Sequence, residues 1–309
     1  MISTILVVSC LTVVVEFLVR KIPNVYGYKF EEITKNDKHY KTLILGSSHS
    51  FFGINPDYLS DPSFNAANVS QDFKYDSYVL EKSLDALSEM EVVILPVSVF
   101  SLFQDMDSGI EFWRKYNYSI WFGYDDIAIE QTFNIKTYSI LFSAPSKTHL
   151  LESVVQNYIT GNFEPTWSKS GWGTEFSDVA TEKALIDSGK TAAARHQKKP
   201  QLNEQNLNYL REIVNICKER NLRLLMVTLP AYGTYRKYLN EERLNEIISI
   251  VNGLSNSSDN VKYLNYLNDD RFVKSDYRDA DHLNHDGAKK FTRILNQALQ
   301  DWTTYQPRD

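Results

Sequence analysis

The chain has 309 residues, of which 43% are hydrophobic and 13% are aromatic. This composition supplies enough apolar side chains for a packed core and excludes a largely disordered protein. The net charge of −6, without a long basic block, argues against a nucleic-acid partner. The two cysteines, Cys10 and Cys217, lie far apart in the sequence, which excludes a disulfide framework and offers no zinc-ligand spacing.

The sequence begins with an apolar run from Ile2 to Val19 that is broken by Glu16. As a helix this run would span about 27 Å, which barely matches the hydrocarbon core of a bilayer. A membrane anchor, a cleaved signal peptide and a buried helix are the three explanations. No basic residue precedes Glu16, as one would in a signal peptide. We therefore expect an uncleaved transmembrane anchor at residues 1–22, a polar stalk at residues 22–41, and one domain that occupies residues 23–309.

Short apolar runs, typical of buried β-strands, recur through this domain. They cover residues 42–45, 64–67, 92–97, 222–229 and 261–267. Amphipathic helical patterns lie between them, at residues 77–87, 204–220 and 241–251. Strands that alternate with helices and read as continuous apolar runs predict a parallel sheet covered on both faces. Residues 102–200 interrupt this alternation with a dense set of aromatic side chains, and we interpret them as an insertion on the sheet.

A serine-rich turn follows the first predicted strand, with the sequence Gly46-Ser47-Ser48-His49-Ser50. Ligands of open parallel sheets bind outside the carboxyl ends of the strands, where this turn lies. Ser48 is the best candidate for a nucleophile, because a glycine two positions earlier lets the backbone turn tightly. Taken alone, such a motif is more often a simple polar turn.

A second motif, Asp279-x-x-His282, lies just before the last predicted helix, for which Asn284 is a plausible N-cap. Asp279 can accept the Nδ1 proton of His282 and leave Nε2 facing a serine. Asp281 is less suited, because adjacent side chains usually diverge. The alternatives are a solvated acidic loop and a metal site of Asp279, Asp281, His282 and His285. The metal site is disfavoured, because no other His or Cys cluster completes it.

Together the two motifs resemble the SGNH (GDSL-type) hydrolase superfamily. The closest resemblance is to membrane-tethered bacterial envelope members, in which Gly-Ser/Thr-Ser-His precedes Gly-Ile-Asn-Pro, here residues 53–56. The resemblance extends over about residues 40–300. It implies an α/β fold that is a three-layer α/β/α sandwich with a central parallel, flavodoxin-like sheet. It also implies a catalytic triad of Ser48, His282 and Asp279.

The oxyanion hole departs from the family pattern. In the family, a glycine and an asparagine join the amide of the serine as donors, and neither has a clear match at residues 68–71 or 98–101. The remaining candidates are the backbone amides of Ser48 and Ser70 and the hydroxyl of Ser98. Loss of one donor typically lowers the rate by about 10²–10³-fold. His49 and Arg195 are candidate substrate-binding residues.

The resemblance implies a serine esterase or O-acyltransferase that acts on acylated, typically acetylated, cell-envelope carbohydrate through an acyl-serine intermediate. Such an enzyme needs no cofactor or metal; its partners are an acylated glycan or small ester and the membrane, through the N-terminal helix. The alternative is a non-catalytic SGNH-fold envelope protein that binds polysaccharide or a protein. Either role places the domain outside the cytoplasm, whereas Arg20, Lys21 and Lys29 would keep it inside by the positive-inside rule.

Overall fold

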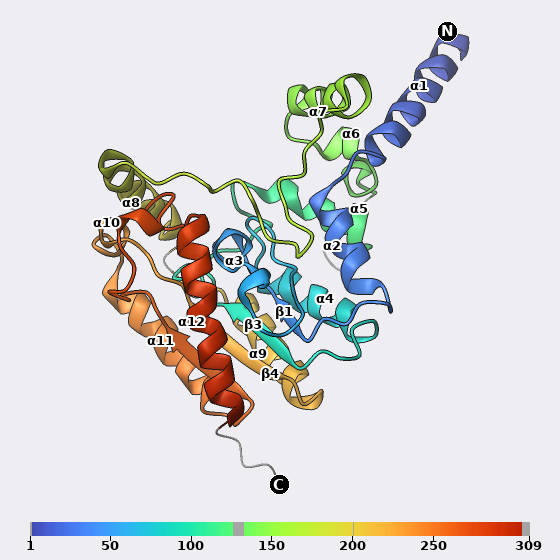
Figure 1. Cartoon of the computed structure of the whole chain (residues 1–309). Coiled ribbons are helices and arrows are strands. Elements are labelled where there is room, and N and C mark those ends of the chain that lie inside the picture. The colour runs from blue at the N-terminus through green and yellow to red at the C-terminus, as the bar shows by residue number, and fades with distance from the viewer. Residues whose placement is uncertain (1, 126–132, 200, 305–309) are drawn as a thin grey trace.

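The protein is described here by a computed structural model that covers residues 2–125, 133–199 and 201–304 (Figure 1). Its centre is a sheet of five parallel strands in the order β2-β1-β3-β4-β5. The strands are β1 (Thr42–Ile44), β2 (Ser63–Asn65), β3 (Val92–Pro96), β4 (Arg223–Thr228) and β5 (Val261–Asn265). Each overlaps one predicted apolar run, so the predicted parallel sheet is confirmed. The strand order is that of a flavodoxin-like fold.

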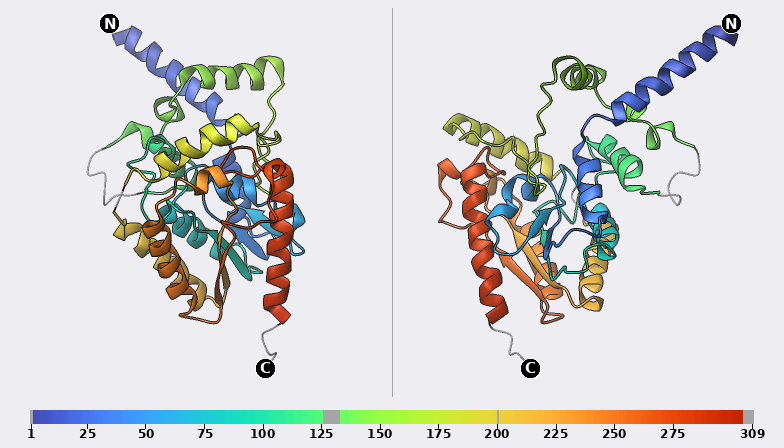
Figure 2. Two further views of the ribbon diagram at one scale, coloured as in Figure 1. Left: turned by 90° about the vertical axis from the view of Figure 1, so that its left-hand side faces the viewer. Right: turned by 45° about the vertical axis from the view of Figure 1, so that its right-hand side comes forward.

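Side chains alternate in direction along each strand, so the apolar strands present an apolar surface on both faces of the sheet. Helices cover both of these faces. Leu43, Val93 and Leu224 pack on one side, and their neighbours Ile44, Ile94 and Leu225 pack on the other. The first side is covered by α2 (Val25–Thr34), α4 (Phe73–Leu84), α9 (Glu204–Glu219) and α11 (Glu241–Ser255). The second side is covered by α12 (His285–Thr304). The predicted three-layer α/β/α sandwich is therefore confirmed, and its layers are visible in Figure 2.

The segment before β1 is not the predicted stalk. It contains helix α2, which begins at the N-cap Asn24 and packs into the domain. Lys29 on this helix is fully buried; its Nζ donates to the carbonyl of Ala67 and lies 4.1 Å from the ring centroid of Phe51. The stalk prediction is wrong because the polar side chains of this segment find partners that are distant in the sequence.

Helix α1 (Ile2–Arg20) extends away from the domain, as Figure 1 shows, and most of its described aliphatic side chains are exposed. Near its C-terminal end, Glu16 accepts a hydrogen bond of 2.8 Å from the hydroxyl of Ser139 in the insertion. Within the described ranges, no helix combines the length and the apolar character needed to cross a bilayer. The anchor at residues 1–22 remains a prediction.

The insertion at residues 102–200 is mostly helical where it is described. It contains α5 (Lys115–Phe122), α6 (Ile140–Ser143), α7 (Lys147–Val154) and α8 (Glu182–His196). Two short 3-10 helices, η2 (Phe112–Arg114) and η3 (Ile135–Thr137), and a π-helix, η4 (Val155–Thr160), lie in the same insertion. Helix α5 packs against α2, and α8 packs against α10 (Gly233–Arg236). The remaining short elements are α3 (Ser48–Gly53), η1 (Pro56–Tyr58) and η5 (Lys274–Asp276). Helix α8 ends at His196, which is buried.

Candidate active site

The turn between β1 and α3 presents Ser48 at the carboxyl end of the sheet. Gly46 has a φ of +107°, a value that residues other than glycine rarely adopt. A Cβ atom there would lie 2.6 Å from Ser50 Oγ and 3.1 Å from Pro96 Cδ. The Gly46 N–H donates to Asp76 Oδ1 at 2.7 Å. A side chain at position 46 would therefore be both strained and crowded, and glycine lets the backbone turn so that Ser48 begins the next helix.

The loop before α12 presents His282. The carboxylate of Asp279 accepts the backbone N–H groups of Asp281 at 3.1 Å and of His282 at 2.9 Å, so the loop closes on itself. Asn284 Oδ1 accepts the N–H of Gly287 at 3.0 Å, which confirms the predicted N-cap of the last helix. These local bonds fix the imidazole relative to the helix behind it.

The structure brings Ser48, His282 and Asp279 into one hydrogen-bonded chain. The Ser48 hydroxyl donates to His282 Nε2 at 2.9 Å. The opposite ring nitrogen, Nδ1, donates to the carboxylate oxygens of Asp279 at 3.0 and 3.2 Å. Burial of the imidazole lowers the pKa of His282, but the carboxylates of Asp281 and Asp279 raise it more, so its pKa lies above the ordinary value. This arrangement suits a base that takes a proton from a serine.

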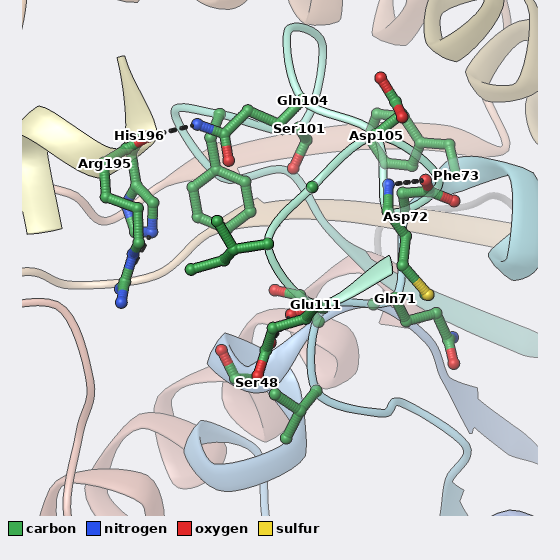
Figure 3. A pocket seen from close by; sticks show the side chains of 18 of the residues that line it. Ser48, Gln71, Asp72, Phe73, Ser101, Gln104, Asp105, Glu111, Arg195 and His196 are labelled. Atoms are coloured by element: carbon green, nitrogen blue, oxygen red, sulfur yellow. Dashed lines mark hydrogen bonds between the residues drawn. The ribbon is translucent and has the colours of Figure 1, made fainter. Parts of the chain in front are cut away.

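A cavity of about 500 Å³ opens in front of Ser48. Figure 3 shows Ser48 at its base, with Arg195 and His196 on one side and Gln71 and Asp72 on the other. Apolar side chains alternate with these polar ones around the wall; they include Phe52, Val69, Phe73, Phe100, Met106, Ile110 and Phe176. A substrate with both apolar and hydroxylated parts would fit such a lining.

Of the predicted oxyanion donors, Ser48 and Ser70 line this cavity and Ser98 does not. Ser70 has a φ of +62°, an uncommon value for a serine, and thus adopts a backbone conformation typical of glycine. Within the described residues, the backbone N–H groups of Ser48 and Ser70 have no hydrogen-bond partner. Ser98 is buried, and its hydroxyl lies 2.8 Å from His49 Nδ1. The geometry therefore favours the amides of Ser48 and Ser70 over the hydroxyl of Ser98.

The two predicted substrate-binding residues lie in different places. Arg195 lines the cavity, where its half-exposed guanidinium can reach a ligand. His49 points away from the cavity into a buried cluster behind His282, so a role in contacting substrate is not supported. The sequence analysis weighed Asp281 only as a less suited partner of His282 or as a metal ligand, and it did not single out His196; both side chains belong to this buried cluster. A sequence signal for them is lacking, because they meet only when α8 packs against the loop before α12.

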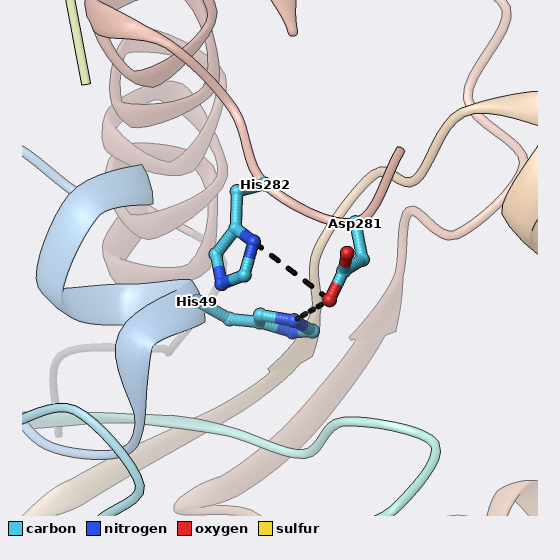
Figure 4. Close-up of side chains that lie close together, drawn as sticks. All are labelled: His49, Asp281 and His282. Atoms are coloured by element: carbon cyan, nitrogen blue, oxygen red, sulfur yellow. Dashed lines mark hydrogen bonds and ion pairs between the residues drawn. The ribbon is translucent and has the colours of Figure 1, made fainter. Parts of the chain in front are cut away.

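The four-residue metal set, disfavoured from sequence, does not assemble among the described residues: His285 Nε2 instead lies 3.1 Å from the carbonyl oxygen of Thr174. A different trio, His49, Asp281 and His282, offers ligand atoms within 4.8 Å of one another (Figure 4). The guanidinium of Arg195 lies 3.8 Å from Asp281 Oδ2 and would repel a second cation there. The trio is better suited to hold protons than a metal ion.

Comparison with known proteins finds one partial family match and distant structural similarities. A protein-family model whose description carries no name matches residues 186–303, less than half of the chain. No curated protein sequence matches. A structure from Streptococcus pneumonia, provisionally described as a platelet activating factor, is 11% identical with a TM-score of 0.45, and the match covers 96% of this chain and 98% of that one. A provisional acylhydrolase from Bacteroides fragilis is 11% identical with a TM-score of 0.42, covering 89% and 94%. Similarity at this level identifies neither activity nor substrate.

Proposed function

We propose that the protein is an SGNH-type serine esterase or O-acyltransferase. The observation that carries the proposal is the hydrogen-bonded chain from Ser48 through His282 to Asp279 at the carboxyl end of a parallel sheet. Each member has the chemical role that acyl transfer requires, namely a nucleophile, a base and a carboxylate that holds the base in the correct tautomer. The cavity in front of Ser48 has room for a small ester or a sugar.

In the first half of the reaction, Ser48 Oγ attacks the ester carbonyl carbon while His282 Nε2 takes the serine proton. The tetrahedral oxyanion accepts hydrogen bonds from the backbone N–H groups of Ser48 and Ser70. Collapse of this intermediate breaks the bond to the alcohol, which leaves with the proton held on His282, and an acyl-Ser48 ester remains. In the second half, a hydroxyl compound gives its proton to His282 Nε2 and attacks the acyl carbon; the bond to Ser48 Oγ then breaks as His282 returns the proton to this oxygen, which frees Ser48. Water as the acceptor gives an esterase, and a sugar hydroxyl gives a transferase.

We further propose that the substrate is an acylated, typically acetylated, carbohydrate of the cell envelope. The mixed apolar and polar lining of the cavity is compatible with an acyl group next to sugar hydroxyls. Attachment through α1 and an extracytoplasmic domain belong to the same proposal. The competing proposal, a non-catalytic envelope protein that binds polysaccharide or a partner, rests on the replacement of the family's oxyanion glycine and asparagine.

Labelling with a serine-directed fluorophosphonate, mapped by mass spectrometry, tests the proposal. Ser48 should be labelled, and both Ser48→Ala and His282→Ala should abolish the reaction. Ser47→Ala is the matched control, because Ser47 lies in the same turn and its side chain makes no capping hydrogen bond. Label that persists in Ser48→Ala would place the nucleophile elsewhere. A wild-type protein that binds acetylated glycan without being labelled would favour the non-catalytic role.

A further inference from the structure

A second carboxylate, not used in the triad, lies beside the base. Asp281 is two residues after Asp279, but its side chain is 2% exposed, whereas that of Asp279 is 29% exposed. Asp281 Oδ2 lies 3.7 Å from His282 Nδ1, and the close-up in Figure 4 shows it beside both His282 and His49. A buried charge at this distance acts on the imidazole with little screening from solvent.

Three imidazoles and one guanidinium surround this single oxygen atom. His49 Nε2 lies 3.4 Å from Asp281 Oδ2, and His196 Nε2 lies 3.9 Å from it. Arg195 Nη2 lies 3.8 Å away on the cavity side. His282 completes the set. Although burial alone raises the pKa of Asp281, the charge of His282 and the hydrogen bond from His49 hold it below its ordinary range, so the carboxylate is ionised.

Two of the three imidazoles are neutral, and one of them, His49, donates to Asp281. His49 Nδ1 lies 2.8 Å from the Ser98 hydroxyl, and His196 Nδ1 lies 2.8 Å from the Tyr235 hydroxyl. When the Ser98 hydroxyl donates to Nδ1 of His49, the ring proton of His49 is on Nε2 and faces Asp281. His196 Nε2 lies 3.4 Å from Arg195 Nη2, which can only donate, so the ring proton of His196 is on Nδ1 and faces the Tyr235 hydroxyl. Burial lowers the pKa of His49, and it lowers the pKa of His196 to about 3. Neither ring therefore takes a positive charge near neutral pH.

His282 differs from these two rings, because its pKa is raised. Of the three imidazoles around Asp281, it is the one able to become an imidazolium and to balance the buried negative charge. The positive charge appears on His282 when this ring takes the proton of Ser48. The reaction needs this imidazolium stabilised at the same step. Asp279 supplies the hydrogen bond to the ring, and Asp281 supplies a second charge.

We propose that Asp281 is a positioning residue for the base: a buried carboxylate, held by the N–H of neutral His49 and by the nearby guanidinium of Arg195, that stabilises the imidazolium of His282. This role rests on the proposed function of the same site. The charged and titratable groups that face His282 are Asp279 and Asp281 from its own loop, His49 from α3, and Arg195 and His196 from α8. A neighbouring opposite charge at this range typically shifts a pKa by about 1–3 units.

Nuclear magnetic resonance titration of the six histidines in the full chain tests the proposal directly. The His282 signal, assigned by its loss in His282→Gln, should titrate at a pH lower by about one unit or more in Asp281→Asn. Asp281→Ser removes the same charge with a smaller side chain and should give the same shift if the asparagine variant misfolds. An unchanged His282 midpoint in either folded variant would overturn the proposal.

Asp276→Asn is the matched control. Asp276 is also buried before α12, and its carboxylate bonds the N–H of Val273 and the Nζ of Lys290 at 2.8 Å each, away from His282. The Asp276→Asn substitution should lower the unfolding temperature and leave the midpoint of the His282 titration unchanged. A midpoint that moves equally in this variant would mean that the shift reports loosened structure.

A second measurement separates this proposal from the proposed function. The pH profile of fluorophosphonate labelling should move to lower pH in Asp281→Asn, with a plateau about tenfold lower. If wild-type protein is not labelled but the His282 midpoint still shifts, the catalytic function fails and the inferred charge effect holds. If labelling falls while the midpoints of the His282 titration and of the labelling profile both stay fixed, Asp281 is merely structural and the proposal is overturned.

Discussion

The cavity has two walls that are built differently. One wall consists of the turn after β1 and the loop before α12, and their residues are fixed by backbone hydrogen bonds and by packing of α12 on α3. The other wall belongs to the insertion, where Lys199 joins Asp105 at 2.6 Å and also bonds Ser108. Lys199 is 42% exposed, and exposed ion pairs typically contribute about 1 kcal/mol or less. The difference suggests that the first wall fixes the chemistry and that the second can adapt to the substrate.

The largest effect is expected in the first wall, from Asp279→Asn. Removing the carboxylate that holds the His282 tautomer should lower kcat/KM on an acetyl ester by about 10⁴-fold. Asp281→Asn should lower it by about tenfold, because Asp281 lacks the short contact to Nδ1. Circular dichroism should show both variants folded. The reverse ranking would mean that Asp281 is the carboxylate of the triad.

The reaction rate should also depend on pH, because His282 in the first wall titrates. Protonated His282 cannot accept the proton of Ser48, so kcat/KM should fall about tenfold for each pH unit below the pKa of His282. That pKa is raised above the ordinary 6.5, because the carboxylates of Asp281 and Asp279 outweigh the opposing effect of burial. Half-maximal activity is therefore expected above pH 6.5 in a profile of kcat/KM. A midpoint at or below this value would contradict the geometry.

The second wall should respond more weakly. Lys199→Ala releases the segment around Asp105 and Ser108, so KM for a sugar ester should change severalfold while kcat changes by about twofold or less. Lys190→Ala is the control; Lys190 is an exposed residue of α8 that does not line the cavity. Steady-state kinetics of both variants provide the comparison. A large loss of kcat in Lys199→Ala would show that the insertion also positions the catalytic residues.

The smallest effect is expected from deleting residues 1–22. The strands and the outer helices of the sandwich lie downstream, and the deletion chiefly removes the packing of the buried side chains of Val19 and Ile22. The truncated chain should remain soluble and unfold cooperatively in circular dichroism, within a few degrees of the full chain. An insoluble or molten product would make α1 part of the core and would refute the predicted anchor.

The first wall could be predicted from sequence because its signals are local. Gly46 and Ser48 lie in one turn, and Asp279 and His282 share one loop, so spacing alone suggests how each pair is arranged. The strands could be predicted for the same reason, since a strand buried on both faces is a continuous apolar run.

The rest of the site depends on contacts between distant segments. His196 belongs to a polar stretch in the sequence and is buried because Tyr235 and Asp281 meet it in space. Lys29 similarly looks like a stalk residue until the carbonyl of Ala67 accepts its proton. The Ser98 hydroxyl is a candidate oxyanion donor in the sequence, but in the structure it forms a hydrogen bond with His49, which is 49 positions away in the sequence. Burial of polar groups follows from such pairings, which no local pattern encodes.

The hydrogen bond from Ser48 to His282 joins positions that are 234 residues apart. Domains form progressively as a chain is synthesised from its N-terminus. A nascent chain therefore carries Ser48 long before His282 has been synthesised, and under the proposed function it would acquire acyl-transfer activity only when α12 docks on α3. Chains shortened before this helix would keep the serine and remain inert toward bystander esters, so reactivity at Ser48 would report the completion of folding.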